Sequence, residues 1–100
     1  MLDLSKIAGF EWDEGNIQKN WLKHSVYSKE CEEIFTNAPL LLLHDTKHSR
    51  NEKRFFGLGH TNTNRLLFIV FTLRNSSIRV ISARTMNKKE QTIYEQTKKI

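Results

Sequence analysis

The stretch RLLFIVFTLRNSSIRVISAR, residues 65–84, decides the fold. Its first part, RLLFIVFTL at 65–73, is apolar at nearly every position, which is typical of a strand buried on both faces. The polar connector RNSS has the length of a hairpin turn, and SIRVISAR at 77–84 is a second run rich in β-branched residues. The stretch therefore predicts two neighbouring antiparallel strands, of which the first is central to its sheet.

Two further runs precede this pair, LLLLH at 40–44 and KRFFGLGH at 53–60. Only short polar connectors separate the four runs, and no helix is expected between successive strands. The runs therefore predict an antiparallel meander and not a parallel α/β sheet. FEWD at 10–13 alternates with the period of a strand and predicts a short extended segment.

Helices are predicted on both sides of the meander. Asp13 suits the N-cap of a first helix that runs through His24, and a second helix is expected over 28–37, where acidic residues favour the first turn. Asn87 and Glu90 form the N-x-x-E pattern that opens a last helix. The expected fold class is α+β, with two N-terminal helices, a four-stranded antiparallel β-sheet and a C-terminal helix.

The composition is that of a globular protein. The chain has 100 residues, of which 38% are hydrophobic and 27% charged, which predicts a single domain over residues 1–100. Its longest apolar run, LLFIVF at 66–71, is far shorter than the roughly 20 residues of a membrane span, and no signal-peptide pattern opens the chain. The lone Cys31 can form neither an internal disulfide nor a CxxC motif. We expect a soluble, cytoplasmic protein with no membrane association.

Charge is polarised along the chain. Residues 1–45 carry four Lys or Arg against eight Asp or Glu, a net of −4, whereas residues 46–100 carry twelve against three, a net of +9. Because the basic half contains the expected strands, the sheet should present a positive surface that suits the phosphates of a nucleic acid. The alternative is a solvated face that only keeps the protein soluble.

The stretch HDTKHSRNEKRFF, residues 44–56, crowds groups that transfer protons and bind anions between two expected strands. His48 can accept or donate a proton near neutral pH, Glu52 can orient it or act as the base, and Arg54 can hold a phosphate. The alternative is a polar hairpin loop with a surface ion pair.

A metal site is the weaker interpretation of the same stretch. His44, Asp45 and His48 have neither the HExxH spacing of a helical zinc site nor a clear fourth ligand. We therefore predict no metal and no cofactor.

Arg79 and Arg84 are a second group of candidates. In a regular strand they have opposite parity and point to opposite faces, so a shared site requires a bulge or a position of Arg84 beyond the strand end. Arg74, at the end of the central strand, is a further cation, and Lys23 lies where the first helix should end. The alternative for each is a cation that only solvates the end of its element.

Taken together, the motifs resemble the BrnT family, the toxin half of a bacterial type II toxin-antitoxin pair. The resemblance runs from about Phe10 to Tyr94 and rests on several ordered blocks with matching spacing. One departure is Ser25, where the family usually has Gly. The matching residues are Phe10, Trp12, Asp13, Asn20, Lys23, His24, Val26, His48, Ser49, Glu52, Arg54, Thr72, Arg74, Arg79, Ile81, Ser82, Ala83, Arg84, Glu90 and Tyr94.

The resemblance implies a RelE-like fold, a ribonuclease activity that arrests translation, and neutralisation by a BrnA-like antitoxin. Such an antitoxin carries a ribbon-helix-helix domain, so operator DNA would be bound only through the toxin–antitoxin complex.

For metal-independent cleavage, His48 or Glu52 would take the proton of an RNA 2′-hydroxyl, and Arg79 and Arg84 would stabilise the charge on the attacked phosphate. Arg54, Arg74 and Lys23 would bind RNA. The acid that protonates the leaving 5′-oxygen is left open among three residues: His48, Lys23 and Tyr94.

Two alternatives remain from the sequence. The same arginines suit a non-catalytic basic module that only clamps phosphates of a nucleic acid or binds an acidic partner. The second alternative is a protein that has lost activity and persists only as the corepressor subunit of the complex.

Overall fold

The computed structural model describes residues 6–15, 17, 24–48 and 52–98. Its sheet has five strands in the order β1-β5-β4-β3-β2. The strands of this sheet are β1 (Gly9–Glu11), β2 (Leu41–Asp45), β3 (Arg54–His60), β4 (Leu66–Arg74) and β5 (Ser77–Thr85). The remaining elements are the helices α2 (Ser28–Ile34) and α3 (Lys88–Lys98) and the 3₁₀ turn η2 (Thr46–His48).

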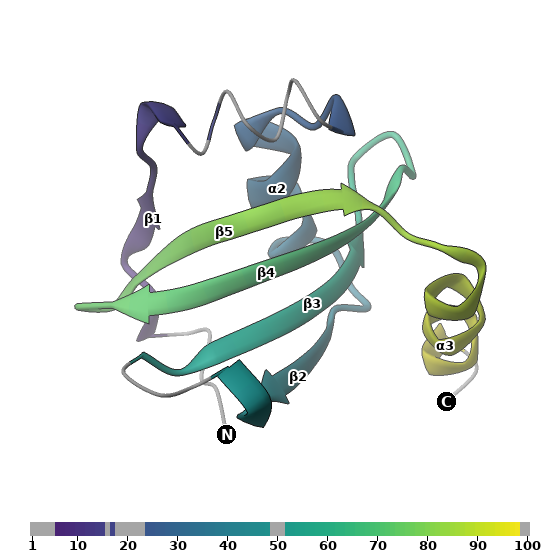
Figure 1. Ribbon diagram of the computed structural model, residues 1–100. Helices are drawn as coiled ribbons and strands as arrows, with labels where there is room; N and C mark the ends of the chain where they lie inside the picture. Colours follow the sequence, from purple (N-terminus) through teal and green to yellow (C-terminus); the bar gives the residue numbers. More distant parts are fainter. Residues whose placement is uncertain (1–5, 16, 18–23, 49–51, 99–100) are drawn as a thin grey trace.

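Helix α2 covers one face of the sheet, behind β4 and β5 in Figure 1. The apolar runs fill the core between them, because Leu67, Ile69 and Phe71 of β4 are fully buried together with Cys31 and Ile34 of α2. Burial raises the pKa of the Cys31 thiol to about 12, which leaves it a neutral, unreactive part of this core.

Gly59 of β3 permits the close packing of α2. A Cβ atom at this position would lie 2.9 Å from Cβ of Ile34, closer than two carbon atoms can approach without displacement. The second glycine in KRFFGLGH, Gly59, therefore permits α2 to pack closely against β3.

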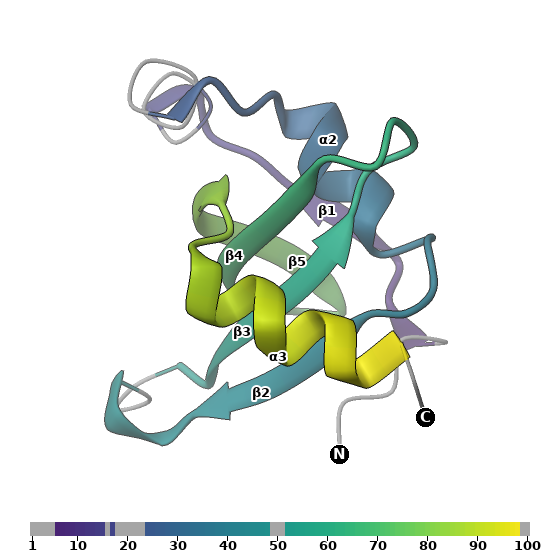
Figure 2. The same cartoon turned by 90° about the vertical axis from the view of Figure 1, so that its right-hand side faces the viewer.

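Helix α3 packs on the opposite face and covers only one end of it, across β3 (Figure 2). Leu58, Met86 and Tyr94 are buried there, with Leu66 and Phe68 of β4 packed against them. The Tyr94 hydroxyl donates a hydrogen bond to the Pro39 carbonyl at 2.6 Å and lies 2.9 Å from Nδ1 of His60. We call the rest of this face, away from α3, the open face.

Arg65 ties the segment before α2 to the sheet. Its guanidinium donates hydrogen bonds to the carbonyls of His24 and Ser25 at 3.1 and 2.7 Å, and it pairs with Glu30 at 2.9 Å. Ser25 has a φ of 53°, so serine occupies the left-handed conformation that glycine takes most easily.

The predicted sheet of four antiparallel strands is wrong. The segment expected to be extended contributes a fifth strand, β1, which pairs in parallel with β5 and places Phe10 opposite Ile78. The sheet is therefore mixed. Period-2 alternation in FEWD indicated an extended conformation, but nothing local to it specifies a partner more than sixty residues further along the chain.

The prediction of two N-terminal helices is also wrong for the described residues, where α2 and α3 are the helices of the fold. Of the expected helix over 13–24, residues 16 and 18–23 lie outside the described residues, and one helical hydrogen bond joins the Ile17 N–H to the Asp13 carbonyl. Helix α2 ends at Ile34, earlier than expected.

The predicted start of the last helix is confirmed. The Asn87 side chain accepts a hydrogen bond from the Glu90 N–H at 2.8 Å, and the Glu90 carboxylate accepts one from the Asn87 N–H at 2.9 Å. Among the described residues, no helix is long and apolar enough to cross a membrane.

Candidate functional site

A β-bulge in β5 brings Arg79 and Arg84 to the same face. Phe71 pairs with Val80, but the preceding Val70 pairs with Ser82, so Ile81 is an extra residue in β5. Such an insertion reverses the parity of every residue beyond it. The bulge that a shared site of the two arginines requires is therefore present.

The same register aligns five side chains in a line across the sheet, which we call the transverse row. Each member is the direct partner of the next on a neighbouring strand, and directly opposed residues point to the same face. Phe71 points to the α2 core, so the row, one residue further along β4, lies on the open face. From edge to edge the row is Asp45, Arg54, Thr72, Arg79 and Glu11.

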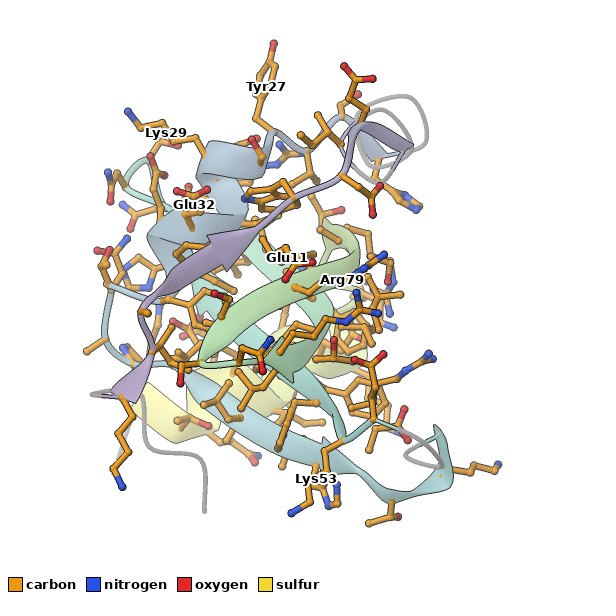
Figure 3. The ribbon with its side chains drawn as sticks, turned by 90° about the vertical axis from the view of Figure 1, so that its left-hand side faces the viewer. Glu11, Tyr27, Lys29, Glu32, Lys53 and Arg79 are labelled. Carbon is orange, nitrogen blue, oxygen red and sulfur yellow. The ribbon has the colours of Figure 1, made fainter. Side chains whose placement is uncertain are left out.

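Ion pairs surround the β5 side of the row. Arg79 pairs with Asp13 at 2.9 Å and lies 4.0 Å from Glu11, the contact that Figure 3 shows between β1 and β5. Arg74 approaches Glu11 at 3.7 Å and pairs with Glu52 at 2.9 Å. The acidic first half of the chain thus meets the basic strands at this point.

Glu52 is held in its ionised form by the arginines of the open face. The hydrogen bond from Arg74 is the main reason that its pKa is lowered; desolvation opposes this, and the charges of Arg74, Arg79 and Arg54 lower the pKa further. The same pair raises the pKa of Arg74. A carboxylate with a lowered pKa is a weak proton acceptor, so this geometry suits Glu52 to orienting arginines more than to general-base catalysis.

Arg84 lies on the same side of the sheet but at its other end, beside α3 and outside the open face. Its partner across the strands is Phe68, four residues along β4 from Thr72, which separates Arg84 from Arg79 by about 13 Å. Its guanidinium stacks on the Phe68 ring at 4.2 Å and forms two hydrogen bonds of 2.8 Å to the Glu90 carboxylate. The hydrogen bonds that Arg84 donates to Glu90 raise the pKa of Arg84.

The other predicted site residues are less closely placed. Lys23 lies outside the described residues, and of His48 the structure describes the backbone, which ends η2 three residues after Asp45 of the transverse row. Tyr94, one of the three candidates for the general acid, is fully buried under α3, and burial raises its pKa.

The residues of the weaker metal interpretation diverge. The His44 ring packs 5.4 Å from Phe55, which belongs to the core on the α2 side, whereas Asp45 belongs to the transverse row on the opposite face. Within the described part of the chain, no three His, Cys, Asp or Glu side chains are grouped as metal ligands.

Sequence reasoning missed Thr72, Glu11 and Asp13 as members of the site. Thr72 occurs in the T-x-R pattern before the hairpin, but nothing in the sequence shows that it lies between two arginines. The alternation in FEWD and the basic β5 strand were both visible, and only their parallel pairing unites them.

Comparison with known proteins connects this geometry to a family. A family model described as the ribonuclease toxin BrnT of a type II toxin-antitoxin system matches residues 12–90. The crystal structure of the Brucella abortus ribonuclease toxin BrnT aligns with a TM-score of 0.61 and 23% identity, over 80% of this chain and 97% of that chain, which shows a shared fold. No curated protein matches the chain. Because the family model spans most of its length, the chain belongs to the BrnT family of ribonuclease toxins of type II toxin-antitoxin systems.

Proposed function

We propose that this protein is a metal-independent endoribonuclease whose site is the open face of the sheet. The observation that carries the proposal is the transverse row, in which Arg54 and Arg79 flank a single position on the central strand. Arg74 and Glu52 lie at its side. Cleavage of cellular RNA at this face would inhibit translation.

The arginines supply the electrostatic part of the reaction. When an RNA 2′-hydroxyl attacks the adjacent phosphorus, negative charge builds on the non-bridging oxygens. Arg79 and Arg54 approach that charge from two sides, and a guanidinium matches two phosphate oxygens at once. The pairs that hold Arg74 and Arg79 in the free protein are with exposed carboxylates, whose attraction is screened by water, so these pairs are readily exchanged.

His48 is the base in this scheme. An imidazole is the side chain type best suited to accept a proton near neutral pH, whereas Glu52 is kept ionised by Arg74. Its backbone follows directly from β2, at the Asp45 end of the transverse row. With His48 as the base, Lys23 is the remaining candidate for the proton donor to the leaving 5′-oxygen, because Tyr94 is fully buried and bonded to the Pro39 carbonyl.

The test is cleavage of a long RNA by the purified protein with excess EDTA. We expect cleavage to persist in EDTA, a DNA strand of the same sequence to stay intact because it lacks the 2′-hydroxyl, and His48→Ala to lose at least about 100-fold in rate. Lys29→Ala is the matched control. Lys29 is an exposed cation on α2, and its substitution removes one positive charge far from the transverse row (Figure 3). Loss of activity in EDTA, or cutting of DNA, would overturn the mechanism.

The type II family implies an antitoxin partner, and we propose a BrnA-like ribbon-helix-helix protein that binds the open face. Expression of the chain alone should arrest growth, and co-expression with such a protein encoded beside it should restore growth. A complex that still cleaves RNA at the parent rate would contradict binding at this face.

A further inference from the structure

Thr72 carries a hydroxyl that the fold leaves unused. The residue is 2% exposed, and its Oγ1 atom is buried without a hydrogen-bond partner among the described residues. A buried hydroxyl without a partner destabilises a fold, and a valine of similar shape would avoid that cost. The fold alone therefore gives no reason for threonine at this position.

The surroundings of Thr72 indicate what the hydroxyl is for. Arg54 lies directly opposite it on β3, and Arg79 lies directly opposite it on β5. Adjacent strands are about 4.8 Å apart, so the two arginines start about 10 Å from each other, with the hydroxyl midway between them. Both side chains are long enough to meet over the threonine.

A group held by two guanidinium ions and one hydroxyl donor must be an oxyanion with several acceptor oxygens. A phosphate fits, because its non-bridging oxygens can accept from both arginines and from the hydroxyl at the same time. A carboxylate presents its two oxygens in one plane and suits a single fork. Asp13 and Glu11 already lie beside Arg79 on the side of β1, at 2.9 and 4.0 Å.

We propose that Thr72 donates a hydrogen bond from Oγ1 to a non-bridging oxygen of an RNA phosphodiester seated between Arg54 and Arg79. This assignment rests on the proposed ribonuclease function and adds a phosphate-binding residue to its site. Binding exchanges Asp13 for the phosphate at Arg79, and it requires a side-chain shift that gives the incoming oxygen access to the buried hydroxyl.

The experiment compares Thr72→Val, which removes the hydroxyl, with Thr72→Ser, which keeps it. The probe is a short mixed-sequence DNA oligonucleotide, which carries the phosphates but cannot be cut by 2′-hydroxyl attack. We expect T72V to melt at the parent temperature or above, to bind the probe at least about tenfold more weakly, and to cleave RNA more slowly. T72S should keep the affinity of the parent. Thr85→Val, an exposed threonine of β5 whose register places it on the α2 side, is the control and should change neither property.

Three outcomes would contradict the proposal that the Thr72 hydroxyl binds a phosphate. These are an unchanged affinity of T72V for the probe, an equal loss in T72S, and a lower melting temperature of T72V, which would mean that the hydroxyl is bonded within the fold. Inorganic phosphate alone is the second probe. If it binds as tightly as the oligonucleotide, the site serves a free anion and the RNA assignment fails.

Failure of the ribonuclease proposal is distinguishable from failure of this one. A parent protein that binds the oligonucleotide but cuts no RNA is not the proposed enzyme, and the affinity difference between T72V and T72S then still decides the role of Thr72. If the parent is active and the phosphate bound by Thr72 is the one attacked, T72V should both raise KM and lower kcat.

Discussion

The two ends of the sheet face opposite α2 carry arginines in different states. At the transverse row, Arg79 and Arg74 pair with carboxylates whose side chains are 42–48% exposed. At the α3 end, Arg84 pairs with Glu90, whose side chain is 16% exposed, and stacks on Phe68. Exposed pairs exchange their partners easily, whereas a half-buried, two-bond pair holds its geometry.

The difference teaches that a basic strand is not one uniform binding surface. The bulge at Ile81 places both arginines of β5 on one face. Only Arg79, at the end away from α3, is available to a ligand. We infer that Arg79 acts on RNA and that Arg84 chiefly holds α3 to the sheet. The predicted catalytic role of Arg84 stays a prediction that the following variants test.

Of the two β5 arginines, Arg79 should matter more for activity, so Arg79→Ala should have the larger effect on the cleavage rate. Removing one guanidinium that faces the attacked phosphate should lower the cleavage rate about 100-fold, the usual result of losing one donor to a developing oxyanion. The free energy of unfolding should change by less than about 1 kcal/mol, because the lost ion pairs are exposed. Single-turnover RNA cleavage and urea unfolding measure the two quantities. A stable variant with the parent rate would show that the row is not the site.

Arg84→Ala should show the opposite pattern. It removes the two hydrogen bonds from Arg84 to the half-buried Glu90 carboxylate and leaves only the one from the Asn87 N–H, which should lower the free energy of unfolding by about 2 kcal/mol. Any loss of activity should follow the unfolded fraction and disappear at low temperature. If the folded variant is inactive instead, the two ends of the face act together, and the distinction drawn above is wrong.

The dependence of stability on acid pH should be the smallest of the three effects. It should also differ between the α3 end of this face and the transverse row. Burial raises the pKa of Glu90, but the hydrogen bonds from Arg84 and the Asn87 backbone outweigh it, so the net pKa lies below 4.5. A carboxylate with a lowered pKa stabilises the fold above its unfolded pKa, and this contribution is lost as the pH falls through the folded value. Stability should therefore decline below about pH 4.5.

Melting curves of Glu90→Gln and Glu52→Gln between pH 6 and pH 3 make the comparison. E90Q should reduce the fall in melting temperature between pH 6 and pH 3. E52Q should change this fall little, because Glu52 is exposed and screened by solvent. Equal effects of the two substitutions would contradict the contrast between the two ends.

Sequence reasoning could find the strands of the meander because their apolar runs are long. The predicted runs 53–60, 65–73 and 77–84 agree with β3, β4 and β5 to within one residue at each end. The arginines could be named as candidates, but the face on which they lie depends on the bulge at Ile81, for which the run IRVISAR gives no side-chain signal.

Long-range pairing explains what was missed. Strand β1 is three residues long, and its parallel partner is β5, so Glu11 and Asp13 reach Arg79 from the opposite end of the chain. The role we infer for Thr72 depends on the registers of β3 and β5 at once. A hydrophobic pattern specifies the face of a strand but not which residue of the next strand lies opposite.

The Arg65 contacts with the segment before α2 act as a non-covalent cross-link. They join residues 35 to 41 positions apart in the sequence, the span over which a small secreted domain would use a disulfide bridge. This chain has a single cysteine, and the Arg65 contacts are hydrogen bonds and an ion pair, which form without an oxidant. The link therefore holds equally under reducing and oxidising conditions, with no need of oxidation during folding.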